Sequence, residues 1–364
     1  MDLPTAQQPA DRLEIRLSDP GEVAAALPQL LGFHPAESVV LVGLGGPSGG
    51  RVGLTVRGDL PPDGHEAPLA RLLVRSLGSD GPAAALAVVV SEAPDDPGPD
   101  GEQATGCLPH RALVHELVLA LAAAGIAARD VLLVRRGRWW SYDCPHACCA
   151  PAAGTPLPAG VSALAAAAVC TGQVVAADRA ALAGRLDPPP GSGPGMRAAC
   201  VRAATGRSAR LREVGAPALA EESWAAVRRA VARSRPGTAG EGPLDDDELA
   251  GVGWALRDVR VRDRALQLAL GADATAAEVL WTECARRVPA PLDAAPATLL
   301  AVSAWLRGDG AMAGIALDRA LDADPGYTLA LLLRKALDAC LPPAGLRDLI
   351  GRAAEPAPAG GPPA

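Results

Sequence analysis

Three side chains are scarce in this chain of 364 residues: it has one phenylalanine, two tyrosines and a single lysine, Lys335. A core rich in phenylalanine is therefore excluded. The interior must be built from alanine, leucine and valine, with six tryptophans as the large fillers. Arginine supplies almost all of the positive charge, which together with abundant alanine, glycine and proline indicates the codon bias of a GC-rich genome. Motifs made of arginine or glycine therefore carry less weight here.

The sequence also lacks the segments that would place it in a membrane or outside the cell. Its first twenty residues have no basic start followed by an apolar stretch, so we expect no secretory signal. The best apolar runs, 83–90 and 117–128, are far shorter than the ~20 residues needed to cross a bilayer. We therefore expect a cytoplasmic protein without a membrane partner, whose eight cysteines remain reduced thiols.

The net charge of -7 favours a soluble protein and argues against a general nucleic-acid coat, which would need a surplus of positive charge. One segment departs from this balance. Residues 196–235 hold nine arginines against three acidic residues, an excess that could contact phosphates or an acidic partner. Only Trp224 is available there for stacking on bases, so we interpret the segment as a solvated helix face.

Strand and helix patterns alternate over residues 11–158, which predicts a three-layer α/β domain with a mixed sheet. Helices are expected from Pro20 to a stop at Gly32, over 66–77 and over 109–124. The glycine-rich segment 45–50 is expected to be a turn between two strands. The strands are expected at 13–17, 38–44, 51–57, 83–90, 131–135 and 138–142, the last being the final strand.

From Val161 onward the strand patterns stop, which predicts an all-α domain over 159–350 and a disordered tail over 351–364. Asp245 and Glu248 form a capping-box pattern, which favours a helix start over a metal site for the acidic run 245–248. Residues 298–337 carry the packing pattern of one tetratricopeptide-like helical hairpin. A single hairpin cannot bury its own face, so we expect it to pack on the preceding helices. The breaks between helices are expected at 187–195, 235–243 and 289–296.

Four potential zinc ligands lie within six residues: Cys144, His146, Cys148 and Cys149. This spacing is compressed, and adjacent cysteines can rarely both reach one metal ion. Cys107 or Cys170 would therefore have to complete the ligand shell. Two other chemistries stay open for the same thiols. Cys144 could form a switchable disulfide with Cys148 or Cys149. Alternatively, one of the thiols could act as a nucleophile beside His146.

The alternative to chemistry at this stretch is packing, and it is the interpretation we favour. Trp139, Trp140, Tyr142 and the thiols would fill the seam between the α/β domain and the helices that follow. Buried free cysteine behaves as a small apolar residue, so this use is ordinary. The stretch nevertheless leaves the sheet at the end of a strand, where loops on a rigid scaffold often form sites.

A second candidate site consists of His34, Glu37 and Ser38, which could serve as acid, base and nucleophile. This loop enters a strand, whereas ligand crevices in open α/β sheets lie beyond the carboxyl ends of strands. The sequence has no Gly-x-Ser-x-Gly nucleophile elbow, so we favour a structural role. The glycine-rich segment 43–50 leads into a strand instead of a helix, and we therefore predict no nucleotide cofactor.

Five separate stretches resemble one family: "LLGFHPAESVVLV" (30–42), "RWWSYDCPHACCAPAAGTPL" (138–157), "LRDVRVRDRAL" (256–266), the segment 280–327 and "LLLRKALDACLPP" (331–343). The chain resembles the actinobacterial family catalogued as domain of unknown function 4192. The resemblance implies a cytoplasmic actinobacterial protein and assigns no residue roles. The family usually has a proline directly after the cysteine pair, whereas Ala150 precedes Pro151 here, which should loosen the backbone without removing a thiol.

These observations favour a binding or regulatory module for a protein or small-molecule partner, without an assembled catalytic site. A metal-binding protein or thiol-dependent enzyme centred on Cys144, Cys148 and Cys149 is the second hypothesis, with zinc as its cofactor. A nucleic-acid-associated protein acting through the arginine-rich helices is the third.

Overall fold

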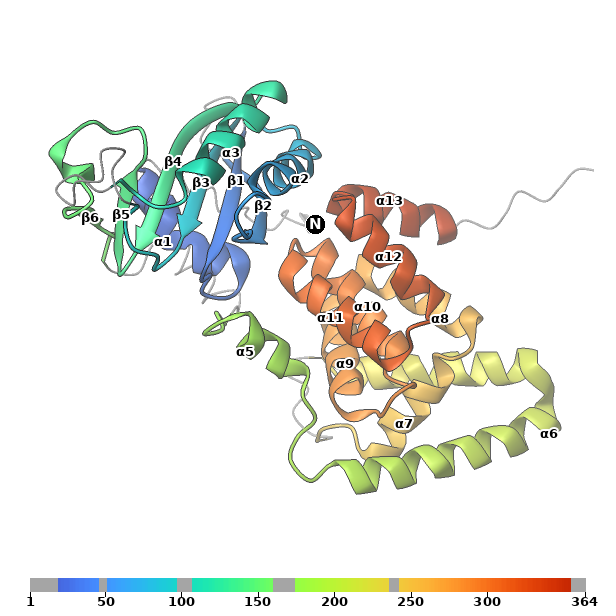
Figure 1. Cartoon of the computed structure of the whole chain (residues 1–364). Coiled ribbons are helices and arrows are strands. Elements are labelled where there is room, and N and C mark those ends of the chain that lie inside the picture. Colours follow the sequence, from blue (N-terminus) through green and yellow to red (C-terminus); the bar gives the residue numbers. More distant parts are fainter. Residues whose placement is uncertain (1–18, 46–50, 97–106, 160–173, 236–241, 355–364) are drawn as a thin grey trace, which may run out of the picture. The chain divides into compact units, whose positions relative to one another are not determined.

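A computed structural model describes residues 19–45, 51–96, 107–159, 174–235 and 242–354 of the chain (Figure 1). The chain divides into two compact units, Met1–Asp178 and Arg179–Ala364. The first unit contains a mixed sheet with helices and the second is helical, which confirms the predicted fold class. The division lies twenty residues beyond the boundary at 158 that the sequence patterns suggested.

The elements of the first unit follow the sequence patterns closely. Asp19 caps the first helix by accepting a hydrogen bond from the N–H of Gly21, and Gly32 ends it in the left-handed conformation with φ 77°. The strand expected at 13–17 lies outside the described residues. The elements are α1 (Pro20–Leu31), β1 (Ser38–Gly45), β2 (Arg51–Asp59), α2 (Glu66–Gly78), β3 (Ala84–Val90), α3 (Arg111–Ala123), β4 (Ala127–Arg135), β5 (Arg138–Ser141), the short 3-10 turn η1 (Ala147–Cys149) and β6 (Thr155–Pro156).

The six strands form one sheet in the order β2-β1-β3-β4-β5-β6. Only β3 and β4 are parallel, because α3 carries the chain back across the sheet between them. The other neighbours are antiparallel, and Val39 of β1 lies opposite Val89 of β3. The expectation that the strand at 138–142 would be the last was wrong, since the two-residue β6 pairs with β5 beyond it.

Both faces of the central strands are buried, as the unbroken apolar runs predict. On one face, Leu41, Val89 and Leu133 join a core that α2 and α3 complete. Val40, Val88 and Leu132 alternate with them along the strands and are fully buried as well, so they lie on the opposite face. Helix α1 contacts β4, and its side chains Ala26 and Leu27 are buried, which completes the three layers.

The second unit contains only helices among its described residues. Helix α6 is interrupted at Gly215, whose φ of 78° and ψ of 167° turn the chain back on itself (Figure 1). The elements are α5 (Arg179–Ala183), η2 (Gly184–Leu186), α6 (Gly193–Arg233), α7 (Asp246–Ala255), α8 (Val259–Leu266), η3 (Gln267–Leu270), α9 (Ala274–Arg287), α10 (Ala294–Leu306), α11 (Gly310–Ala323), α12 (Thr328–Asp338) and α13 (Pro343–Ala354).

Two local predictions for this unit are confirmed. Asp245 accepts a hydrogen bond from the N–H of Glu248, and the Glu248 carboxylate accepts one from the N–H of Asp245, which is the predicted capping box. Helices α10 and α11 pack as a hairpin, and α10 also packs against α9, as expected for a single hairpin. Helix α13 extends to Ala354, past residue 351 where the tail was expected, and residues 355–364 lie outside the described part. None of the described helices combines the length and the apolar character needed to cross a bilayer.

Candidate functional site

The cysteine-rich stretch forms a loop between β5 and β6 that several contacts tie to the sheet. The indole N–H of Trp140 donates to the carbonyl of Ala150 at 3.1 Å. The guanidinium of Arg138 donates to the carbonyls of Ala153 and Gly154 at 3.1 and 2.7 Å. Gly154 has φ 68° and lies directly against the Trp140 ring, where a larger residue would not fit. The strand that precedes the loop therefore also holds the loop's C-terminal end.

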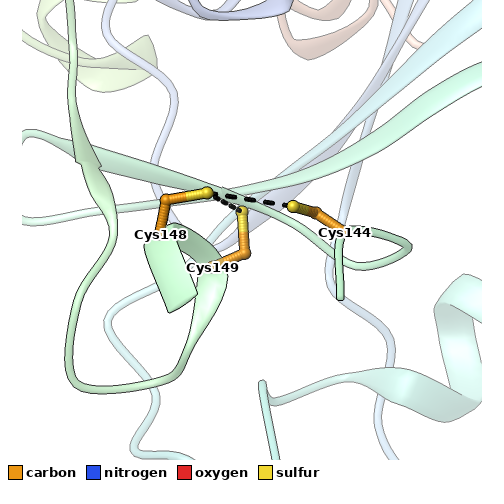
Figure 2. Close-up of side chains that lie close together, drawn as sticks. All are labelled: Cys144, Cys148 and Cys149. Atoms are coloured by element: carbon orange, nitrogen blue, oxygen red, sulfur yellow. Dashed lines mark hydrogen bonds between the residues drawn. The ribbon is translucent and has the colours of Figure 1, made fainter. Parts of the chain in front are cut away.

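Three thiols converge inside this loop (Figure 2). The Sγ atoms of Cys144 and Cys148 are 3.9 Å apart, and those of Cys148 and Cys149 are 4.0 Å apart. All three sulfur atoms lie within 4.8 Å of one another. The 3-10 turn η1 brings the sulfur atoms of the two neighbouring cysteines close together and near that of Cys144, an arrangement that their spacing in the sequence made unexpected.

The three thiols differ in exposure and in acidity. Cys148 is exposed, Cys144 is half-buried and Cys149 is buried. The backbone N–H of His146 lowers the pKa of Cys144, because it stabilises the thiolate. Burial raises the pKa of Cys149 to about 11, although the N–H of Ser141 donates to its sulfur at 3.3 Å and opposes that shift. The loop thus contains one thiol with a lowered pKa beside one with a raised pKa.

This geometry fits a soft metal ion. A tetrahedral zinc ion with Zn–S bonds of ~2.3 Å separates its sulfur ligands by about 3.8 Å. Two of the three sulfur separations, 3.9 and 4.0 Å, are close to that value, and the third is no more than 4.8 Å. Among the described residues, His146 and Cys107 do not belong to the group, and Cys170 lies outside the described part of the chain. Three thiols, and not the four ligands considered from the sequence, form the cluster.

The aromatic residues of the stretch have packing roles. Trp140 and Tyr142 belong to the core that α2 and α3 complete, and the Tyr142 hydroxyl donates to the carbonyl of Pro109 at 2.6 Å. Arg135 stacks over the Trp140 ring at 5.0 Å and pairs with Asp95 at 2.9 Å. Trp139 points to the other face of the sheet. There its indole lies against Gly21 of α1. These side chains therefore pack within the first unit itself.

The second candidate site does not assemble as a triad. His34 is exposed and its backbone N–H donates to the carbonyl of Ala176 at 3.1 Å. Ser38 is fully buried, and its hydroxyl forms no hydrogen bond with a described residue. Glu37 is exposed and instead bonds to residues at the end of β3.

Glu37 takes part in a polar network that sequence reasoning missed. The Ser91 hydroxyl donates to the Glu37 carboxylate at 2.8 Å, and Nε2 of His110 lies 2.9 Å from the same hydroxyl. Glu37 and His110 both have left-handed backbones, with φ 40° and 61°. Ser91 is only 2% exposed, so its oxygen is closed to a substrate. The network ties three loops together. One feature of the sequence could have indicated this network: Ser91 lies directly after the carboxyl end of a central strand, where sites often form.

Four of the nine arginines in the arginine-rich segment form ion pairs with described residues of the second unit. Arg202 pairs with Asp247 at 2.7 Å, Arg210 pairs with Glu222 at 2.6 Å, and Arg235 pairs with Asp273 at 2.7 Å. Such pairs reduce the number of free cations that phosphates would need. The segment keeps part of its positive charge, and the ion pairs favour the interpretation as a solvated helix face.

Comparison with known proteins places these features in one family. The model of a family described as a domain of unknown function (DUF4192) matches residues 20–344. Neither the curated proteins nor the solved structures gave a match. The matched range includes the thiol loop, the Ser91 network and the helices of the second unit up to α12.

Proposed function

This chain belongs to the family described as a domain of unknown function (DUF4192), and we propose that its first unit binds a thiophilic metal ion. Cys144, Cys148 and Cys149 would hold the ion, with zinc as the preferred metal because thiolates suit its borderline-soft character. The convergence of three sulfur atoms within 4.8 Å is the observation that carries the proposal. A disulfide would involve only two of these thiols and would not account for the third.

The loop is suited to this role because its backbone is set before any ion binds. The bonds from Trp140 and Arg138 hold the C-terminal end of the loop, and β5 continues directly into its other end, so the loss of conformational entropy on binding would be reduced. The exposed Cys148 gives an ion a route to the buried Cys149. Zinc supplies a positive charge that favours deprotonation of the bound thiols.

Three thiolates leave one coordination position of a tetrahedral ion for a ligand from outside the cluster. We therefore propose a binding or regulatory protein in which the ion, or a partner that supplies the fourth ligand, controls the state of the first unit. A thiol-dependent enzyme is the competing function. Among the described residues, no histidine or carboxylate belongs to the thiol group to act as a base, which favours the binding role.

The test is a zinc competition titration of the full chain under reducing conditions, with Cys148→Ser and Cys340→Ser compared. Cys340 is a half-buried thiol of the second unit and serves as the matched control. We expect one zinc ion per chain and at least a ~100-fold loss of affinity in Cys148→Ser, since removing a ligand exceeds the effect of removing a supporting group. Equal affinity in the two variants, or no zinc uptake by folded protein, would contradict the proposal. Rapid alkylation of Cys144 in protein that takes up no zinc would favour the enzyme instead.

A further inference from the structure

A cavity lies within the second unit, between helices that the structure describes. It has a volume of about 690 Å³ and is enclosed by the two arms of α6 together with α7. The arms face each other because Gly215 reverses the chain between them (Figure 1). The volume falls in the range of ~300–1,000 Å³ that is typical of small-molecule sites.

Part of the cavity wall is apolar and rigid. Leu219 and Val252 are buried at its base. The half-buried Trp254 lines it as well, and its indole N–H donates to the carbonyl of Cys200 at 2.9 Å, which holds the ring in place. A second, smaller cavity of about 270 Å³ shares Leu219 and Trp254 with the first. These side chains offer a surface for the apolar body of a ligand.

The carboxylates that line the cavity are already neutralised. Asp247 pairs with Arg202 at 2.7 Å, and Glu248 pairs with Arg233. The third carboxylate, that of Glu222, accepts hydrogen bonds from Arg210, which does not line the cavity. The acidic residues therefore leave no uncompensated negative charge facing the interior.

Two arginines of the cavity lack such a partner. The Arg207 guanidinium donates to the neutral hydroxyl of Ser223 at 2.8 Å, and burial lowers its pKa, which shows the cost of holding the charge there. Asp258 lies near it but accepts its hydrogen bonds from Arg260. Arg229 is exposed and forms no ion pair with a described residue. A guanidinium stays protonated in proteins, so the cavity carries a net positive charge.

We propose that this cavity binds a small organic anion with an apolar body. Its carboxylate or phosphate group would contact Arg207 and Arg229, and its body would lie against Trp254 and Leu219. A planar guanidinium fork suits both headgroups. This site is independent of the metal site in the first unit.

The probe is anilinonaphthalene sulfonate, an anion on an aromatic body whose fluorescence rises on binding, titrated into the full chain. We compare Arg207→Gln with Arg228→Gln, an exposed neighbour that does not line the cavity. We expect saturable binding at one site and a loss of about tenfold or more in Arg207→Gln only, as for a hydrogen bond to a charged group. Equal affinity in both variants, or no saturable binding, would overturn the proposal.

Displacement of the probe distinguishes the headgroups. Octanoate and octyl phosphate, one or both, should displace it at concentrations at which octanol does not. Equal displacement by octanol would show an apolar site without selection for charge and would contradict the proposal. If Arg207→Gln fails to fold by circular dichroism, Arg229→Gln takes its place, because that side chain is exposed. The same affinity in Arg229→Gln and Arg228→Gln would then refute the anion site.

Discussion

The substitution Gly154→Ala tests whether Trp140 positions the thiol loop. Gly154 has φ 68°, and a side chain in that conformation costs ~1–2 kcal/mol. An added Cβ would also enter the Trp140 ring, with Cη2 only 2.9 Å away, and overpacking of this kind costs ~1–3 kcal/mol. The ring cannot move freely because it is 4% exposed and bonded to Ala150. Together these effects predict a loss of roughly 2–5 kcal/mol in the first unit.

Gly137→Ala is the matched control. Gly137 has φ 71°, yet an added Cβ would meet nothing within 4 Å, so only the backbone cost applies. Hydrogen exchange of β4 amides, followed by mass spectrometry of the peptides, reports the opening free energy of this unit alone. We expect Gly154→Ala to exceed Gly137→Ala by ~1–3 kcal/mol and to weaken zinc binding as well. Equal losses in the two variants would refute the role given to Trp140.

Three further predictions concern the rest of the molecule. Burial raises the pKa of both Tyr142 and Tyr327, so their phenolate absorbance should appear above pH ~10 in the native protein. The stability of the fold should fall as the pH rises past the unfolded pKa of ~10, because only the unfolded tyrosines then ionise. Ionisation near pH 10 without unfolding would contradict this. Trp281→Ala empties a site that is 1% exposed and should cost ~3–5 kcal/mol in urea unfolding of the second unit. A loss below ~1 kcal/mol would show that Trp281 is not a core filler. Asp245→Ala removes the α7 cap and should cost ~1 kcal/mol, seen as faster hydrogen exchange at the start of that helix; unchanged exchange would exclude the capping role.

The sequence patterns predicted the fold well because its determinants are local. Unbroken apolar runs marked β1 and β3, and Gly32 and the Asp245 capping box marked helix ends. The two-residue β6 carries no periodicity, so no pattern could indicate it. The reversal of α6 at Gly215 was missed for a different reason, since glycine is too common in this chain to mark one particular turn.

The candidate sites were predicted less well, because they depend on loop backbone and on long-range contacts. The types of residue in the thiol cluster were identified, but the convergence of Cys148 and Cys149 follows from the 3-10 turn that they share. Glu37 was identified as a candidate, but its partners were not. Ser91 and His110 are 54 and 73 positions away from it in the sequence, and the folding of the sheet brings them close to it. The ion pairs of the arginines likewise could not be predicted from the sequence, because they depend on how the helices pack.

X-ray absorption spectroscopy of the reduced, zinc-loaded chain tests the proposed zinc site, because it counts the atoms bound to the ion. We expect three sulfur scatterers at ~2.3 Å and one lighter atom. Loss of one sulfur scatterer in Cys148→Ser, with no change in Cys340→Ser, would place the ion at the cluster. A spectrum with only nitrogen and oxygen neighbours, or one that Cys148→Ser leaves unchanged, would contradict it.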